Sequence, residues 1–541
     1  MYIFENPVLQ RELLVNLRTR RAMLLLIGYN LVLGILVFLA WPQQRRLDLT
    51  QGSDEAKNLI NLFFLGQYVL ASLMAPSFAA GSITGEKERK TYEMLLASPL
   101  RPAAVVLGKL FASLAHLAVL IFSSLPIVML CLPLGGVSLY EVLAAYLALM
   151  LSVALYGMIS VACSSYFRRT ASALVVSYLV ILPMALVAVL LWNAMGQTGE
   201  FRLILTVTVL PALFGVIVVG LFAQTSARLL HPPDVGSEGK EVVDLEQEHQ
   251  HSVGLVIHAD QFPDRLLVPA PRTTLLRDGV NPVFDKELRS EIFSQGTLML
   301  RVVIMVSMVL AVPLMAVFLY LKVDLAPWYI AYVLLFNVLV GPVFTAGSIT
   351  GERERQTLEM LLTTMISPGQ ILWGKLLSGL RVSTVLTAFV AWPVLWAFVM
   401  GSFGWANIWT VPAYLGIIVM TCLSTAILAM FCSVFCRKTS TSLMTSYLLI
   451  GTMFCLPMAL RFFADTYYPG SASAHWNESS QLISPLSAAF NTPLKFNMQN
   501  MTDRVGTWDQ YFSYLGFTAA LDLFLLAAIY RLFQTRWRVA E

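Results

Sequence analysis

The stretch GSITGEKERKTYEMLL at residues 81–96 occurs a second time, almost unchanged, as GSITGERERQTLEMLL at residues 347–362. Shorter motifs recur around the two copies in the same order. They are Asn6-Pro7-Val8 with Asn281-Pro282-Val283, Gly108-Lys109-Leu110 with Gly374-Lys375-Leu376, Cys163-Ser164 with Cys432-Ser433, and Leu182-Pro183-Met184 with Leu456-Pro457-Met458. Motifs that recur in one order over most of the chain indicate a tandem duplication of one unit.

The composition indicates that this unit lies in a membrane. Of the 541 residues, 57% are hydrophobic and only 13% are charged, and the mean hydropathy is +0.71. A soluble domain carries roughly a quarter charged residues. The composition therefore excludes a disordered protein, a disulfide-stapled secreted protein and a nucleic-acid-binding protein. The cysteines lie in or beside apolar runs, where small buried side chains are expected rather than a metal site.

Apolar runs long enough to cross about 30 Å of hydrocarbon come in two sets of six. The first set covers about 22–41, 58–80, 104–131, 139–165, 171–195 and 204–229. The second set covers about 297–321, 328–347, 370–400, 406–434, 440–463 and 512–534. We therefore predict an all-α polytopic membrane protein of about 12 transmembrane helices. Its domains are a six-helix half at 1–230, a flexible linker at 231–280, and a second six-helix half at 281–541 with a long outer loop at 464–511.

The basic residues predict the orientation of these helices. If the N-terminus is cytoplasmic, about two thirds of the 36 lysines and arginines fall in the cytoplasmic segments and about a fifth in the outer loops. Both termini and the linker are therefore predicted to be cytoplasmic, in a multi-pass protein of the plasma (inner) membrane. Each half has an even number of spans, so both halves have the same topology.

The repeated stretch is charged although it lies between two apolar runs. Thr84 and Thr350 are suited to cap the start of a helix, and Glu86 and Glu352 favour its positive end. The pattern predicts a short amphipathic helix, ended by a proline, at the cytoplasmic surface. Such a helix either stabilises a tight loop or forms a docking surface for a soluble partner, and its presence in both halves favours docking.

The pattern Gly-Glu-x-Glu-x-x-Thr-x-Glu-x-Leu-Leu, followed by Pro and then Gly-Lys-Leu, resembles the membrane subunits of ABC type-2 permeases. The resemblance implies the six-helix type V exporter fold in each half, with an amphipathic connecting helix at 6–21 and at 281–294. It makes the repeated stretch the coupling helix, which contacts an ABC ATPase subunit. The implied contact residues are Glu86, Glu88, Thr91, Glu93, Glu352, Glu354, Thr357 and Glu359. The family normally pairs two six-helix chains, whereas this chain fuses them.

The resemblance implies a permease component of an ATP-driven exporter, with two copies of a separate ABC ATPase as partners. The nearest approach to a P-loop in this chain, at residues 369–376, has Leu376 where Ser or Thr would bind magnesium. No cofactor is therefore expected on this chain, and ATP and magnesium are expected in the partner. We also expect no catalytic residue, no metal site and no contact with nucleic acid.

Few charged residues fall well inside apolar runs, where burial of a charge is expensive, and these are Lys109, Lys375, Arg381 and Asp522. Lys109 and Lys375 lie near the cytoplasmic boundary and are predicted to extend toward it. Asp522, in the last run, either pairs with a neighbouring helix or contributes to cargo handling.

The family's route for cargo runs along the second and fifth helices of each half. The candidate lining residues are polar but uncharged, which suits an amphiphilic cargo in the bilayer better than a bare ion. They are Asn61, Gln67, Tyr68, Ser177, Tyr178, Asn337, Ser446 and Tyr447. The same residues also suit hydrogen bonding between helices.

Two other functions share part of this pattern. An ion- or proton-coupled secondary transporter also has twelve helices in two repeats, but it needs coupling charges near the middle of both halves. An ATPase-driven membrane scaffold without a transported cargo shares every feature of the exporter.

Overall fold

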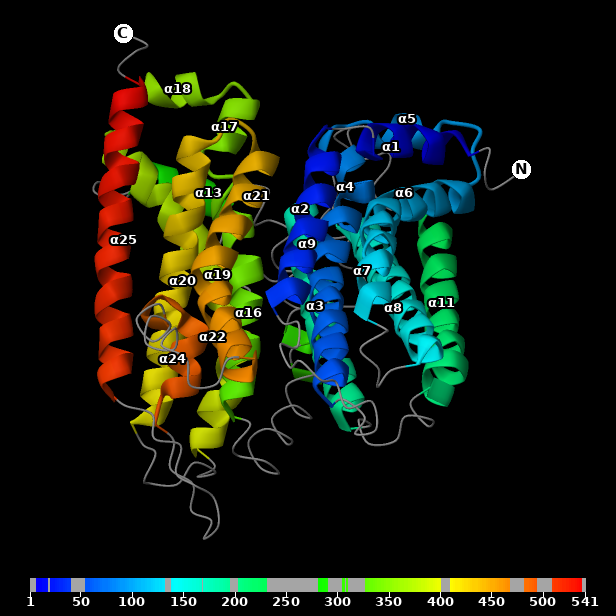
Figure 1. The fold of residues 1–541 in the computed structure, drawn as a ribbon. Helices are drawn as coiled ribbons and strands as arrows, with labels where there is room; N and C mark the ends of the chain where they lie inside the picture. Colours follow the sequence, from blue (N-terminus) through cyan, green and yellow to red (C-terminus); the bar gives the residue numbers. More distant parts are fainter. Residues whose placement is uncertain are drawn as a thin grey trace. The chain divides into compact units, whose positions relative to one another are not determined.

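A computed structural model describes residues 6–17, 20–39, 54–131, 138–167, 169–194, 203–230, 281–289, 304–306, 308–309, 326–399, 409–467, 481–493 and 508–537. The chain divides into two compact units, Met1–His251 and Ser252–Glu541, which we describe separately (Figure 1). The predicted linker at 231–280 lies outside the described residues.

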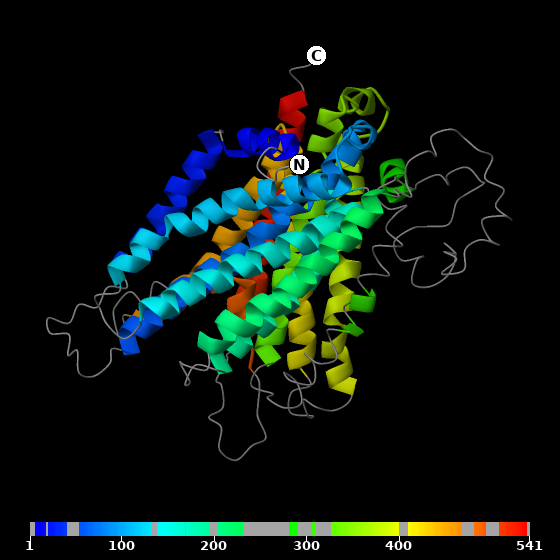
Figure 2. The same cartoon turned by 90° about the vertical axis from the view of Figure 1, so that its right-hand side faces the viewer.

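The first unit is a helical bundle built around α8 (Leu139–Tyr166). Ser138 and Glu141 form a capping box that begins α8. The other elements are α1 (Pro7–Leu17), α2 (Arg20–Leu39), α3 (Asp54–Ala79), α4 (Gly81–Glu88), α5 (Tyr92–Leu96), α6 (Pro102–Ser123), α7 (Leu125–Cys131), α9 (Thr170–Ala194), η3 (Leu205–Val209) and α11 (Leu210–Leu230). Helices α3, α6, α9 and α11 pack against α8, and α1 packs against α6 (Figure 2).

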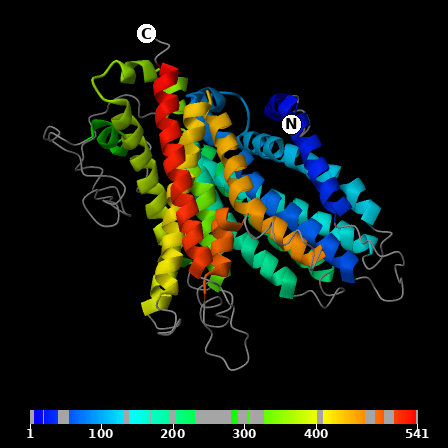
Figure 3. The same ribbon diagram turned by 60° about the vertical axis from the view of Figure 1, so that its left-hand side comes forward.

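The second unit repeats this arrangement around α20 (Thr410–Phe435). The other elements are α13 (Pro282–Arg289), α16 (Ala326–Thr345), α17 (Thr350–Glu354), α18 (Leu358–Leu362), α19 (Pro368–Val399), α21 (Thr439–Ile450), η8 (Gly451–Cys455), α22 (Leu456–Tyr467), η9 (Gln481–Ile483), α24 (Pro485–Asn491) and α25 (Trp508–Trp537). Helices α16, α19, α21 and α25 pack against α20, and α13 packs against α19, as α1 packs against α6. Helix α25, red in Figure 3, runs along α20.

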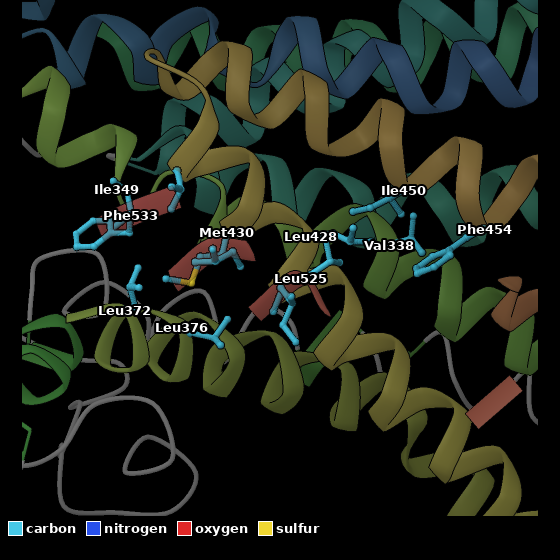
Figure 4. Close-up of a cluster of buried hydrophobic side chains, with 14 of the residues drawn as sticks. Val338, Ile349, Leu372, Leu376, Leu428, Met430, Ile450, Phe454, Leu525 and Phe533 are labelled. Carbon is cyan, nitrogen blue, oxygen red and sulfur yellow. The ribbon is translucent and has the colours of Figure 1, made fainter. Parts of the chain in front are cut away.

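A cluster of buried side chains fixes the repeated stretch to the core of the second unit. Leu376 from α19, Met430 from α20 and Phe533 from α25 pack together in this cluster (Figure 4). Ile349, from the repeated stretch, is fully buried in it, and Ile83 of the first unit is 1% exposed. The repeated stretch therefore begins inside the protein rather than on its surface.

The described residues are helical and contain no strand, which confirms an all-α polytopic membrane protein. Ten of their helices are long and apolar enough to span a bilayer. The predicted first run, 22–41, falls on α2, where Leu26–Ile35 forms a shorter apolar helix. The predicted run at 297–321 lies almost entirely outside the described residues.

The repeated stretch is not the single helix predicted from its sequence. Its first part, α4, extends the long helix α3, and the chain then turns at Lys90, whose φ is 57°. Gln356 makes the same turn in the second unit with φ 58°. The left-handed backbone at these residues ends one helix and lets the next, α5 or α18, run across the end of its unit (Figure 1).

The predicted caps are wrong for the same reason. Thr84 is fully buried and its hydroxyl donates to the carbonyl of Ala80, one turn earlier in a continuing helix. Thr350 donates in the same way to Ala346. A threonine whose hydroxyl bonds to the preceding turn does not cap the N–H groups ahead of it, so neither residue is a helix cap, although Thr350 is the first residue of α17.

Candidate functional site

A buried lysine joins three elements at the end of the first unit that carries α5. Lys109 of α6 is 4% exposed, and its Nζ lies 3.2 Å from Oε1 of Glu86 and 3.5 Å from Oε1 of Glu12. Glu86 belongs to α4 and Glu12 to α1. We call Glu12, Glu86 and Lys109 the first charge triad. Lys109 was expected to extend to the membrane boundary, but two carboxylates instead hold it inside the protein.

The second unit contains the same arrangement. Nζ of Lys375, which is 3% exposed, lies 2.6 Å from Oε1 of Glu287 and 3.1 Å from Oε1 of Glu352. These three residues, from α13, α17 and α19, form the second charge triad. The exposed Lys286 adds a longer ion pair of 3.5 Å to Glu352. Each lysine thus neutralises charge from two elements that are far apart in the sequence.

Glu88 and Glu354 cap the helix that follows the central helix of each unit. An oxygen of Glu88 accepts a hydrogen bond of 2.8 Å from the backbone N–H of Thr170, where α9 begins. Glu354 accepts from the N–H of Thr439 at 3.0 Å and from its hydroxyl at 2.8 Å, where α21 begins. A carboxylate at this position satisfies free N–H groups and favours the positive end of the helix.

The cation directly before each capping glutamate, Lys87 or Arg353, binds the C-terminal end of the central helix. Nζ of Lys87 donates to the carbonyls of Ser165 at 2.8 Å and Phe167 at 3.2 Å, just at the end of α8. Arg353 donates to the corresponding carbonyls at the end of α20. The sequence did not single out these cations, although the conservative exchange of Lys for Arg between the halves was a signal of them.

A serine on the central helix holds the start of the repeated stretch. Oγ of Ser164 accepts from the backbone N–H groups of Ile83 at 3.0 Å and Thr84 at 2.9 Å. Ser433 accepts from the two corresponding N–H groups in the second unit. The recurrent Cys-Ser motif is therefore an anchor for the repeated stretch.

Only part of the predicted docking set lies on an exposed surface. Thr91 and Thr357 direct their hydroxyls to the carboxylates of Glu86 and Glu352, inside the loop. At the turn of each loop, residues 88–90 and 354–356 are exposed. On the short helices that follow, Glu93 and Met94 on α5 and Glu359 and Met360 on α18 are exposed, and the two methionines are 75% and 72% exposed. We call these two pairs the exposed pairs. Four of the eight predicted contact residues are thus exposed, namely Glu88, Glu93, Glu354 and Glu359, and the other four are half-buried within the loop. Contact of these residues with a partner stays a prediction.

The Asn-Pro-Val and Gly-Lys-Leu motifs meet where α1 contacts α6. Nδ2 of Asn6 donates to the carbonyl of Ala104 at 2.5 Å, and its Oδ1 accepts from the N–H of Val8 at 3.0 Å. A Cβ on Gly108 would lie 3.0 Å from Nδ2 of Asn6 and 3.2 Å from the backbone nitrogen of Leu9. Only glycine permits this close contact of two helices.

The second unit repeats this contact. Nδ2 of Asn281 donates to the carbonyl of Gln370 at 2.6 Å. A Cβ on Gly374 would lie 3.0 Å from the backbone nitrogen of Phe284. Both recurrent motifs therefore encode one contact between helices, made once in each unit.

The predicted lining residues of the first unit bond to neighbours within that unit. Gln67 donates to Oγ of Ser124 at 2.6 Å, and the hydroxyls of Tyr68 and Tyr156 lie 2.5 Å apart. Tyr178 donates to the carbonyl of Leu73, Ser177 donates to the carbonyl of Ala173, and Asn61 is exposed.

In the second unit the amide of Asn337 bonds to four side chains. These are Ser383, Thr387, Cys422 and Thr425. Ser446 and Tyr447 donate to backbone carbonyls. The bonds of Asn337 and Tyr447 join helices of one unit, the bond of Ser446 lies within α21, and a role of the residues in lining a path stays a prediction.

Asp522 is 3% exposed on α25 and faces α20. Its Oδ2 accepts a hydrogen bond of 2.9 Å from Oγ of Ser424. Pairing with a neighbouring helix, one of its two predicted roles, is therefore present in the structure. In the part of the chain that the structure describes, no group of three or more His, Cys, Asp or Glu side chains could hold a metal.

Comparison with known families gives two matches, one in each half of the chain. Residues 26–200 match one sequence profile described as ABC-2 family transporter protein, and residues 282–536 match a second profile of the same description. Each match covers the long helices that surround one copy of the repeated stretch. No match is found among curated proteins.

Proposed function

Because this chain belongs to the ABC-2 transporter family and carries two of its domains in tandem, we propose that it supplies the whole membrane portion of an ATP-driven exporter. It is a membrane component of an ABC transporter. In the proposal, two copies of a separate ABC ATPase bind ATP and magnesium, and this chain binds no nucleotide itself. A secondary transporter, the alternative from another class, does not fit a chain built of ABC-2 domains.

The observation that supports this proposal most strongly is that each unit holds one short helix, α5 or α18, on a loop that is fixed by contacts with that unit. Four contacts hold the loop in place in each unit. They are the charge triad, the glutamate that caps the following helix, the loop cation that binds the end of the central helix, and the buried isoleucine. The exposed pairs lie on α5 and α18, the short helices that this loop presents at the end of its unit. A fixed surface with a protruding methionine suits the docking of a soluble partner, because little ordering is needed on binding.

The position of this surface fits an ATPase in the cytoplasm. The basic residues predict that the repeated stretches and both termini are on the cytoplasmic side of the plasma membrane. ATP binding in the partners would then push on α5 and α18 and change access to a path between the halves. We propose an amphiphilic cargo, because the candidate lining residues are polar and uncharged.

The experiment that tests the proposal is co-purification of the tagged chain with an ABC ATPase, combined with changes in the exposed pairs. We expect about two ATPase copies per chain, and the double variant Met94→Asp, Met360→Asp is expected to release them. A charge placed in a desolvated contact costs several kcal/mol. The double variant Glu93→Lys, Glu359→Lys changes the same surface without loss of the methionines.

Asp509→Lys serves as the matched control, because Asp509 is exposed at the start of α25 and lies outside the loop. It is expected to keep the ATPase bound. Wild-type chain that purifies without any ATPase, from membranes that contain one, would refute the proposal. Binding that survives both double variants would show that docking occurs elsewhere.

A further inference from the structure

The two charge triads have a geometry that the docking surface alone does not require. Each lysine lies on the long helix after the loop, and its two carboxylates come from the helix before the loop and from the short helix α1 or α13. We propose that Lys109 and Lys375 are positioning residues that hold these three elements as one body, so that a push on the docking helix moves all three. This proposal rests on the proposed function.

The first argument is the burial of the lysines. Both are at most 4% exposed, and each has ion pairs to two different elements. A buried ion pair is expensive to break, because the remaining charge is left without its partner in a poorly solvated place. A lysine that only filled space near a membrane boundary would extend its ammonium group into water instead.

The second argument is a direct connection from the docking helix to the triad. Thr91, the residue before α5, donates its hydroxyl to the same carboxylate of Glu86 that binds Lys109. Thr357 and Glu352 repeat this connection before α18. The docking helix is therefore separated from the long helix α6 or α19 by only two side-chain contacts.

The third argument is that the backbones are also in contact at this place. Gly108 and Gly374 lie directly before the two lysines in the sequence, and each touches the start of α1 or α13 without room for a Cβ. Close backbone packing and an ion pair on adjacent residues resist both separation and sliding of the two helices. Both features occur in both units.

The alternative is that the triads only stabilise the fold. A variant in which all three triad residues are replaced by uncharged ones distinguishes this role from the proposed one. The triple variant Lys109→Met, Glu12→Gln, Glu86→Gln leaves no charge unpaired, so it is expected to fold and to melt close to the wild type. The corresponding variant in the second unit is Lys375→Met, Glu287→Gln, Glu352→Gln. Lys109→Arg keeps the charge and is expected to retain function. Arg101→Met, which removes an exposed cation at the start of α6, is the matched control.

The first measurement needs no ATPase. Amide hydrogen exchange of Pro7–Leu17 in the purified chain is expected to accelerate about tenfold in the neutral variant of the first unit, which corresponds to about 1.4 kcal/mol. Arg101→Met and Lys109→Arg are expected to leave this exchange unchanged. Unchanged exchange in the neutral variant would overturn the proposal, even if the proposed function is correct.

The second measurement uses the complex with the co-purified ATPase. The neutral variants are expected to keep the ATPase bound, because the exposed pairs are unchanged, but to lose its stimulation by the membrane chain about tenfold. Faster exchange with full stimulation would leave the triads a structural role only and overturn the proposal. If wild-type chain binds no ATPase, the proposed function fails, and the exchange measurement alone decides whether the lysines hold α1 and α13.

Discussion

The structural role of Lys109 and Lys375 depends on partners that are remote in the sequence. Each is a single charge inside an apolar run, and the simplest expectation for such a lysine is an extended side chain that reaches water. Their carboxylate partners lie 23 residues before the lysine in the loop, and 97 or 88 residues before it in α1 or α13. No periodic pattern joins positions so far apart. The repetition of all three residues in both halves was the only signal.

Asp522 is a second buried charge, but it has no cation within its described contacts. Its Oδ2 accepts a hydrogen bond from the hydroxyl of Ser424, and its Oδ1 accepts no hydrogen bond in the structure. A carboxylate in this position is costly in a membrane helix, and an amide keeps the acceptor for Ser424 without an ionisable group.

We therefore expect Asp522→Asn to keep the fold, with a free energy of unfolding within about 1 kcal/mol of the wild type. Stimulation of the ATPase is expected to remain. Thermal unfolding in detergent and ATPase assays check this, with Asp509→Asn as a control on the same helix. A folded Asp522→Asn protein that binds its ATPase but no longer stimulates it would instead assign Asp522 to cargo or proton handling.

At the scale of elements, the sequence predicted the long helices well and the loop between them less well. A long apolar run that spans the membrane must be helical, because such a segment must satisfy all its backbone hydrogen bonds internally. The loop was expected to be one amphipathic helix because its charges recur at helical spacing. The turn at Lys90 and Gln356 was missed, since neither residue is the glycine that usually marks a left-handed turn.

The candidate site was only partly predictable for a related reason. The sequence located the loop and its eight polar residues, but it assigned all of them to the partner. In the structure Glu86, Glu88 and Thr91 bind to this chain itself, and Glu88 and Glu93 are the exposed members of the set in the first unit. Residues that anchor a loop and residues that contact a partner can share one repeated motif. Only their three-dimensional contacts distinguish them.

The contact between α1 and α6 gives a prediction at this scale. Gly108→Ala places a methyl group 3.0 Å from Asn6 and 3.2 Å from the backbone of Leu9. We expect a loss of roughly 1–3 kcal/mol in the free energy of unfolding. Gly220→Ala is the matched control: nothing lies within 4 Å of its Cβ position, so it is expected to stabilise its helix by up to about 1 kcal/mol.

Thermal unfolding of the two variants measures whether Gly108→Ala lowers the free energy of unfolding and Gly220→Ala raises it. Hydrogen exchange of Pro7–Leu17 shows whether the effect of Gly108→Ala is local to α1. Equal stability of the two alanine variants would mean that α1 does not pack on α6 as closely as the structure shows. Gly374→Ala is expected to repeat the result in the second unit, where the backbone nitrogen of Phe284 lies 3.0 Å from the added carbon.

At the scale of the whole molecule, the duplication places two copies of the proposed docking surface, the exposed pairs, on one chain. Both units keep the charge triad, the caps and the exposed methionine, whereas their inner polar contacts have diverged. Asn337 and its four partners in the second unit have no equivalent at the corresponding apolar positions of the first, among them Ala71 and Leu117. The triads, caps and exposed methionines at the loop end are thus shared by both halves, whereas the side-chain contacts of Asn337 occur in the second half and not at the corresponding positions of the first.

This distribution predicts two equivalent and separate ATPase sites per chain. Met94→Asp alone is expected to leave one ATPase bound, at Met360, and Met360→Asp alone is expected to leave one bound at Met94. The physical reason is that each substitution places a charge in only one desolvated contact, and that contact alone loses several kcal/mol of binding free energy. Native mass spectrometry of the detergent-purified complex counts the copies directly, and Asp509→Lys is expected to retain two. Release of both copies by either single variant would contradict separate sites and would mean that the ATPase binds this chain only as a preformed pair.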